Sequence, residues 1–138
     1  MTLLPNKGFK NSDGCSGYAN SVMQCLLHSN TIRKICSADS STCLKQLVSN
    51  YEGTGADTVL DCMDVRTEIG SPFDGHDQQD PISYLEALLT TYPSLSPLIK
   101  HKISVELQCD SCKFVTVDTK EQVFMSISIP KDSKFKHE

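Results

Sequence analysis

The spacing of apolar residues changes once along this chain of 138 residues, close to residue 100, and this change limits the folds open to it. Before it, apolar residues recur at the spacing of a helix, and after it they alternate with polar residues, as in a strand. Helices followed by strands predict an α+β architecture and argue against a wound parallel sheet. We therefore expect a helical part at residues 1–100 and a β part at residues 101–138.

Five helices are predicted in the first part. Asn20 or Ser21 is available to cap the first helix, Ser41 or a neighbour the third, and Asp57 the fourth. Pro81 suits the first turn of the fifth helix, where its missing N–H costs nothing. The expected ranges are Tyr18–His28, Thr31–Cys36, Thr42–Tyr51, Thr58–Glu68 and Asp80–Thr91.

Three strands are predicted in the second part. The first carries Ile103, Val105 and Leu107, the second covers 115–119 and the third 123–129, with a tight turn at Cys109–Cys112 between the first two. A three-stranded sheet with one Cys-x-x-Cys leaves an edge open and the cysteines without partners. We therefore expect a piece of a longer domain.

The charge balance and the cysteines narrow the class of protein. The 13 basic residues are outnumbered by 17 acidic ones, which argues against nucleic acid as the main partner. No apolar run approaches the roughly 20 residues of a membrane span, so no membrane partner is expected. Seven cysteines without an apolar export signal at the start predict reduced thiols and a cytoplasmic or nuclear location.

Three segments resemble, in the same order, three blocks of the ubiquitin-specific proteases. The sequences GFKN at 8–11 and YANSVMQCL at 18–26 resemble the cysteine box of that family. Residues 73–89, which contain the sequence HDQQD, resemble its glutamine box. Residues 107–112 and the segment 124–130 are similar to the first zinc knuckle of its fingers region and the strand that follows.

This resemblance implies a papain-like cysteine protease fold, of which the chain supplies the helical thumb and the start of the antiparallel β fingers. The implied activity is thiol-dependent hydrolysis of the isopeptide bond at the C-terminus of ubiquitin, and the implied partner is ubiquitin or a ubiquitin-like modifier. In the family, the general base belongs to a histidine box in the palm. None of the four histidines of this chain lies in such a box.

The slot of the family's nucleophile is occupied here by Gly17, which has no side chain for the chemistry. Cys15, two residues upstream, is the nearest thiol: it is either a displaced nucleophile or a loop thiol without a role. The resemblance also makes Asn11 the oxyanion donor, although the loop after it is one residue longer than the pattern. His76 is either close to the cleft or a solvated loop residue.

Two further groups of residues have a structural and a functional interpretation. The resemblance assigns Gln78, Gln79 and Asp80 to binding of the substrate tail, whereas Asp80 also suits the N-cap of the helix that begins at Pro81. Cys109 and Cys112 have the spacing of half a zinc site and would bind Zn²⁺ only if further ligands complete it. Four other cysteines are expected as small core residues: Cys25, Cys36, Cys43 and Cys62.

Three hypotheses follow from these patterns. The first is a ubiquitin-specific-protease-like catalytic-domain fragment that is inactive as this chain alone. The alternative is a catalytically silent pseudoprotease module that binds ubiquitin, which Gly17 favours. The third, a small zinc-binding domain unrelated to ubiquitin, depends on Cys109 and Cys112 alone.

Overall fold

The computed structural model describes residues 7–53 and 59–128, and it has a mixed α+β architecture. The chain separates into two compact units, Met1–Ile99 and Lys100–Glu138. In the described ranges, six α-helices belong to the first unit and a two-stranded antiparallel sheet belongs to the second. The α+β class predicted from the change in apolar spacing is confirmed at this level.

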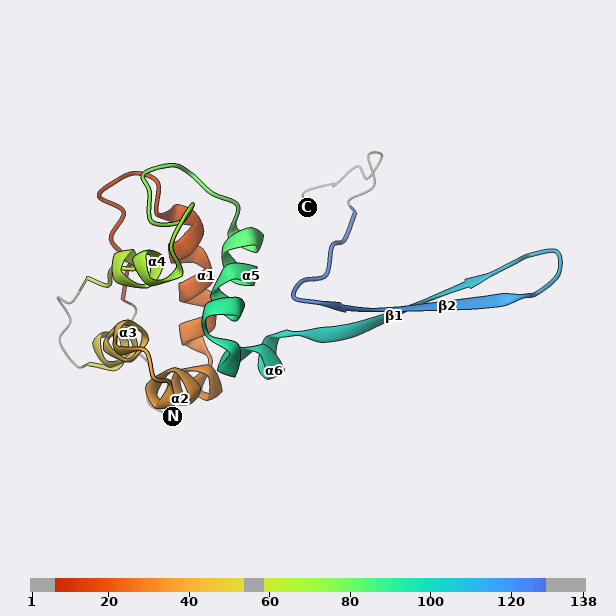
Figure 1. Cartoon of the computed structure of the whole chain (residues 1–138), viewed down its shortest axis with the longest axis horizontal. Coiled ribbons are helices and arrows are strands. Elements are labelled where there is room, and N and C mark those ends of the chain that lie inside the picture. Colours follow the sequence, from red (N-terminus) through yellow and green to blue (C-terminus); the bar gives the residue numbers. More distant parts are fainter. Residues whose placement is uncertain (1–6, 54–58, 129–138) are drawn as a thin grey trace, which may run out of the picture. The chain divides into compact units, whose positions relative to one another are not determined.

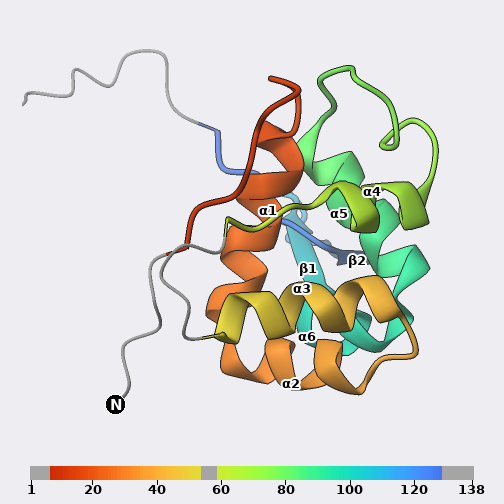
Figure 2. The same ribbon diagram turned by 90° about the vertical axis from the view of Figure 1, so that its left-hand side faces the viewer.

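The first unit is a bundle of short helices in which α1 and α5 lie side by side (Figure 1). α2 and α3 pack against each other at the end of α1 from which α2 continues (Figure 2). The bounds are α1 Gly17–His28, α2 Asn30–Ala38, α3 Thr42–Glu52, α4 Met63–Ile69, α5 Pro81–Thr91, the 3₁₀ turn η1 Pro93–Leu95 and α6 Ser96–Ile99.

The start of α1 differs from the sequence prediction. The helix is capped at Ser16, rather than at Asn20 or Ser21, and it begins at Gly17. The backbone N–H of Ser16 donates to Asn11 Oδ1 at 2.9 Å and to Asp13 Oδ1 at 3.1 Å. These side-chain acceptors satisfy a donor that the helix itself leaves unpaired, so the first turn forms earlier than the apolar pattern indicates.

The fourth helix is also displaced: α4 begins at Met63, not near residue 58. Leu60 forms an isolated parallel bridge with Phe9, in which Lys10 N–H donates to Leu60 O at 2.7 Å and Leu60 N–H donates to Gly8 O at 3.1 Å. A residue whose backbone groups pair with another segment is not free to join a helix. The predicted cap, Asp57, lies outside the described residues.

An aromatic cluster joins the first turn of α1 to the segments that carry the predicted glutamine box. The ring centroids of Tyr18 and Tyr84 are 5.4 Å apart, as are those of Phe73 and Tyr84. Tyr18 Oη also donates to Phe73 O at 3.2 Å. All three rings are buried, so α1, α5 and the loop between α4 and α5 are held together beneath the site described below.

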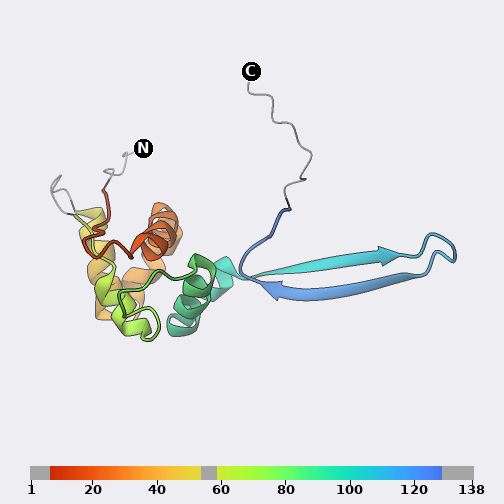
Figure 3. The ribbon, with the colours of Figure 1, turned by 90° about the horizontal axis from the view of Figure 1, so that it is seen from above.

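The second unit is a hairpin of β1 His101–Gln108 and β2 Val115–Gln122 (Figure 3). The antiparallel register pairs His101 with Gln122 and Gln108 with Val115. The third strand predicted at 123–129 is wrong for residues 123–128, where no strand forms; Ile129 lies outside the described residues. Alternating apolar residues fit extended backbone, but a strand also needs a neighbour for its backbone hydrogen bonds.

Among the helices in the described ranges, none combines the length and apolar character that crossing a bilayer requires.

Candidate functional site

Arg66 on α4 is fully buried and connects the two loops that carry most of the predicted site residues. On the loop before α1, its Nη1 donates to Asp13 Oδ2 at 2.9 Å and to Ser16 Oγ at 2.6 Å. On the loop between α4 and α5, its Nε donates to Phe73 O at 2.7 Å and its Nη2 donates to Gly75 O. A single guanidinium therefore fixes these two loops against each other.

Asp13 is the anionic partner of Arg66, and its carboxylate is surrounded by donors. Its Oδ1 accepts from the backbone N–H groups of Cys15 and Ser16, both at 3.1 Å. Both of its oxygens also accept from Ser16 Oγ, at 2.8 and 3.0 Å. Hydrogen bonds from Cys15, Arg66 and Ser16 hold the pKa of the Asp13 carboxyl far below its usual range, so it is ionised at neutral pH.

Cys15 lies directly before the cap of α1 and is buried, with 4% of its surface exposed. Its Sγ donates to Asp13 Oδ2 at 3.0 Å, and this hydrogen bond, together with desolvation, raises the pKa of the thiol. Arg66 Nη2, 4.0 Å from Sγ, acts in the opposite direction but is the smaller influence. The sulfur is therefore a protonated thiol at neutral pH in this arrangement, the reverse of an activated nucleophile.

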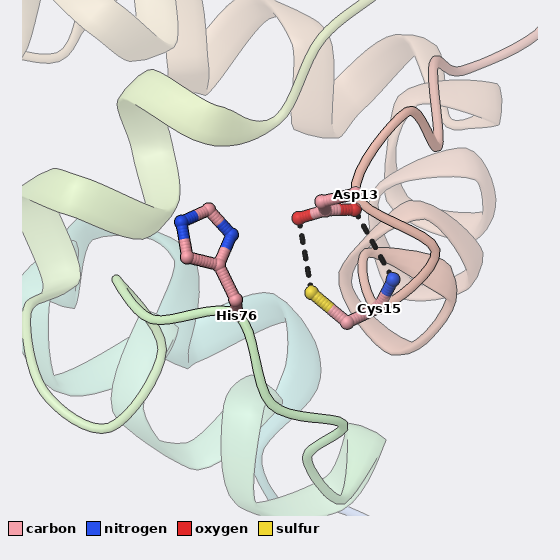
Figure 4. A group of neighbouring side chains, drawn as sticks. All are labelled: Asp13, Cys15 and His76. Carbon is pink, nitrogen blue, oxygen red and sulfur yellow. Dashed lines mark hydrogen bonds between the residues drawn. The ribbon is translucent and has the colours of Figure 1, made fainter.

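His76 lies on the opposite loop, and its imidazole faces Asp13 and Cys15 (Figure 4). One ligand atom of each of these three residues lies within 4.8 Å of the other two. Asp13 and Cys15 come from the loop before α1, and His76 comes from the loop between α4 and α5. Arg66 donates to the carbonyl of Gly75, which precedes His76, and also to Asp13. These two contacts hold His76 close to the loop that carries Cys15.

Gly17 and Asn11 are both at the start of α1. Gly17 is the first residue of the helix, and a Cβ built on it would meet no atom within 4 Å. The oxygen of the Asn11 amide accepts from Ser16 N–H, so that end of the side chain serves the helix cap. The geometry thus gives Asn11 a structural task, and its predicted role as oxyanion donor stays a prediction.

The segment that carries Gln78, Gln79 and Asp80 contacts the loop before α1 through Gln78. Its Nε2 donates to the carbonyl of Gly14 at 3.1 Å, across 64 residues of sequence. Gln79 is half-buried, and Asp80 caps α5 by accepting from Ser83 N–H at 2.8 Å. The capping interpretation of Asp80 is confirmed, and the substrate-binding roles of the three residues stay predictions.

The remaining cysteines differ in exposure. Cys109 and Cys112 are exposed, at the turn of the hairpin, and hydrogen bonds from Cys112 and Ser111 lower the pKa of Cys109. Cys36 and Cys62 are buried as expected, and burial raises the pKa of both thiols. Cys25 is exposed and Cys43 is partly exposed, so the core assignment is wrong for Cys25. The helix turns Met23 and Leu27 inward instead.

A pocket of about 150 Å³ adjoins the Asp13 loop. It is lined by Lys10, Ser12, Asp13, Ser16, Asp61 and Met63. Its volume is below the range of roughly 300–1,000 Å³ that is typical of small-molecule sites. This pocket therefore suits a few atoms, such as a short polar group or water, rather than a cofactor.

No protein-family model matches this chain, and no curated protein matches it. The arrangement around Arg66 therefore has to be interpreted from its own chemistry.

Two central residues of this arrangement, Asp13 and Arg66, were not singled out from the sequence. Arg66 belongs to an ordinary helical segment, and its distance of 53 residues from Asp13 gives no local signal. One indication was available for Asp13: an Asp three residues before the cap of a helix, here Ser16, suits a role in the turn that leads into the helix. For Arg66, its burial is what reveals the role.

Proposed function

We propose that this chain is the thumb and the first finger strands of a ubiquitin-specific-protease-like domain, and that it binds ubiquitin or a ubiquitin-like modifier without hydrolysing it. The observation that carries this proposal is the hydrogen bond from Gln78 Nε2 to Gly14 O. It brings together the two segments that resemble the cysteine and glutamine boxes. In the family, these boxes act at one cleft, so their contact in this chain supports the resemblance.

The chemistry of the loop before α1, which carries Cys15, supports binding without hydrolysis. Gly17 offers no nucleophile at the start of α1. The Cys15 thiol is buried, donates to Asp13 and has a raised pKa. A thiol hydrolase needs a thiolate that the substrate can reach. Two interpretations therefore predict that this chain alone does not hydrolyse ubiquitin conjugates: the chain is a piece of an active deubiquitinase, or it is a pseudoprotease module.

Binding is tested by titrating the full chain into isotope-labelled ubiquitin and following the chemical shifts. We expect weak, saturable shifts, and we expect Gln78→Ala to weaken the binding. Gln46→Ala on α3 is the matched control, because Gln46 is also exposed and its Nε2 bonds a side chain of its own helix, Asn50. Unchanged ubiquitin spectra at saturating concentrations would remove the proposal.

The absence of hydrolysis is tested with a fluorogenic ubiquitin substrate. We expect no turnover by the full chain, and the same result for Cys15→Ser. The second candidate function is a thiol hydrolase in which His76 serves as the base for Cys15. It is favoured by the proximity of the sulfur and the imidazole, within 4.8 Å. Turnover that disappears in both Cys15→Ser and His76→Gln would establish that function instead.

The same proposal makes Cys109 and Cys112 one half of a zinc knuckle. Structural zinc sites have four ligands, and this turn supplies two. We therefore expect the pair to bind Zn²⁺ tightly only when further thiolates are provided. A zinc ion that Cys109→Ser releases from the monomeric chain would contradict this expectation.

A further inference from the structure

The group formed by Asp13, Cys15 and His76 combines three different donor atoms. A thiolate sulfur, an imidazole nitrogen and a carboxylate oxygen are ligands that zinc accepts together. Alkaline-earth ions prefer oxygen ligands alone. We propose that Asp13, Cys15 and His76 form a three-ligand site for Zn²⁺, with water in the fourth position. This proposal does not depend on ubiquitin binding.

The distances fit a site that closes on the ion. In a tetrahedral zinc site with bonds of about 2.0–2.3 Å, the ligand atoms are roughly 3.5 Å apart. Here one ligand atom from each residue lies within 4.8 Å of the others, and Cys15 Sγ is 3.0 Å from Asp13 Oδ2. The imidazole nitrogen therefore has to approach the other two ligand atoms by at most about 1.3 Å, and the sulfur and oxygen have to separate by about 0.5 Å. Both are side-chain adjustments.

Two of the ligands are held in place before any ion arrives. Asp13 is fixed by the N–H groups of Cys15 and Ser16 and by Ser16 Oγ. The two backbone N–H groups bind Oδ1, whereas Oδ2 accepts from Arg66 Nη1 at 2.9 Å, from Ser16 Oγ at 3.0 Å and from Cys15 Sγ at 3.0 Å. An ion at Oδ2 therefore takes the place of the thiol hydrogen bond and shares this oxygen with Arg66. Cys15 is buried, so its sulfur has few alternative positions. Partners of this kind around a ligand set its orientation and raise the affinity of the site.

Arg66 is the outer partner of the proposed site. It binds Asp13 on one loop and the carbonyls of Phe73 and Gly75 on the other, and so it sets the separation of Cys15 and His76. A cation near a metal is unfavourable, and the two anionic ligands offset most of this cost. Ionised Asp13 and the Cys15 thiolate bring two negative charges against the three positive charges of Zn²⁺ and Arg66, so one net positive charge remains when the ion is bound.

The proton balance is simple. Without the ion, the proton stays on Cys15 Sγ, which donates a hydrogen bond to Asp13 Oδ2. When the sulfur–zinc bond forms, this proton leaves to solvent, and the sulfur and Oδ2 both coordinate the ion. His76 is exposed, and a nitrogen of its imidazole supplies the third bond; water takes the fourth position in the proposed site. The metal therefore also blocks Cys15 as a nucleophile.

The test uses the full chain with Cys109→Ser and Cys112→Ser, so that the hairpin pair cannot contribute. After treatment with a chelator, Co²⁺ is titrated as a spectroscopic substitute, and Zn²⁺ is then added to displace it. We expect one Co²⁺ per chain, with the near-ultraviolet charge-transfer absorption of a cobalt–thiolate bond. Zn²⁺ should abolish this absorption.

Three variants in that background assign the ligands. Cys15→Ser should abolish the charge-transfer absorption, and His76→Gln should weaken Co²⁺ binding by more than about tenfold, the least that even an outer partner contributes. Cys25→Ser should change nothing, because Cys25 is an exposed thiol on α1 outside the group. Absence of stoichiometric binding, or a charge-transfer band that survives Cys15→Ser, would overturn the proposal.

His76→Gln gives an answer even if a Cys15 variant fails to fold. His76 is exposed and the substitution leaves the contacts of Arg66 intact, so its circular dichroism spectrum should match the parent. If the folded His76→Gln variant binds Co²⁺ with the affinity of the parent, the three-ligand site is wrong.

Discussion

At the scale of single residues, the Asp13–Arg66 pair is the interaction with the largest expected effect. The side chain of Arg66 is fully buried and that of Asp13 is 12% exposed. Removing one member of such a pair leaves a buried charge without compensation, which typically costs about 3–5 kcal/mol. We therefore expect Asp13→Ala to lower the free energy of unfolding by about 3 kcal/mol at pH 7, measured by urea denaturation.

The same pair predicts a dependence on pH. The pKa of Asp13 is lowered in the folded chain, so its contribution is complete above the unfolded value, near 4, and is lost as the pH falls toward the folded value. The difference in unfolding free energy between the wild type and Asp13→Ala should thus be smaller by about 1 kcal/mol at pH 3 than at pH 7. An identical difference at both pH values would contradict the assigned direction.

Gly17 gives a second prediction at this scale. A side chain at this position has open space around it and lies at the first residue of α1, where the helix dipole favours a thiolate. We expect Gly17→Cys to fold and to react with iodoacetamide at pH 7 faster than Cys25, the exposed thiol in the middle of the same helix. Mass spectrometry of the two peptides measures both rates in one sample. Equal rates would show that the start of α1 does not activate a thiol.

The sequence predicts the role of a residue where a local pattern determines it, and does not where the role depends on a distant contact. The capping role of Asp80 follows from a local pattern, an Asp directly before a Pro and an apolar stripe, and it is confirmed. The proximity of Cys15 and His76 depends on Arg66, which binds the backbone carbonyls of Phe73 and Gly75. Carbonyl groups are present at every position, so no sequence pattern marks the ones that a distant guanidinium selects.

At the scale of elements, two capping serines differ in what they connect. Ser29 caps α2 through a long contact of 3.4 Å from Ile32 N–H. Ser41 caps α3 by accepting from Leu44 N–H at 3.1 Å, and its hydroxyl also donates to Glu68 Oε2 at 2.6 Å. Glu68 in turn accepts from Tyr92 Oη at 2.8 Å. Ser41 thus joins α3 to α4 and to the residue that precedes η1.

We therefore expect Ser41→Ala to destabilise the chain more than Ser29→Ala does. Losing a helix cap costs about 1 kcal/mol, and losing the hydrogen bond to a charged group adds roughly 1.5–3 kcal/mol. The measurement is the free energy of unfolding of both variants under the same conditions. If Ser29→Ala is the more harmful substitution, the connection through Glu68 contributes nothing measurable.

The elements themselves were predicted well where apolar spacing decides them. α3 and α5 lie within one residue of the expected ranges, because each has a capping side chain and a continuous buried stripe. α4 is shorter than expected, since Leu60 pairs with Phe9 instead of entering the helix. That bridge is a contact between segments about 50 residues apart, and periodicity within one segment carries no information about it.

At the scale of the whole molecule, the two units differ in how their apolar residues are used. In the hairpin register, Val105 pairs with Asp118 and Glu106 pairs with Val117. Directly paired residues share one face of a sheet, so the apolar residues of β1 and β2 lie on opposite faces. Neither face is uniformly apolar, and Val105 and Val117 are 51% and 57% exposed. The helical unit, by contrast, encloses side chains such as Leu27 and Leu88 completely.

This contrast predicts unequal resistance to local opening. A two-stranded hairpin is marginally stable in water, whereas the buried helices open only with the folded unit, at a cost of several kcal/mol. We expect the amides of β1 and β2 to exchange with deuterium at least about 100-fold faster than the slowest amides of α1 and α5, after correction for sequence.

Low concentrations of urea separate the two kinds of opening, because global unfolding exposes much surface and local opening exposes little. The exchange of the α1 amides should therefore accelerate with urea while that of the hairpin amides stays nearly constant. Hairpin amides that exchange as slowly as those of α1, with the same urea dependence, would mean that the hairpin is stabilised by burial that its exposed side chains do not reveal.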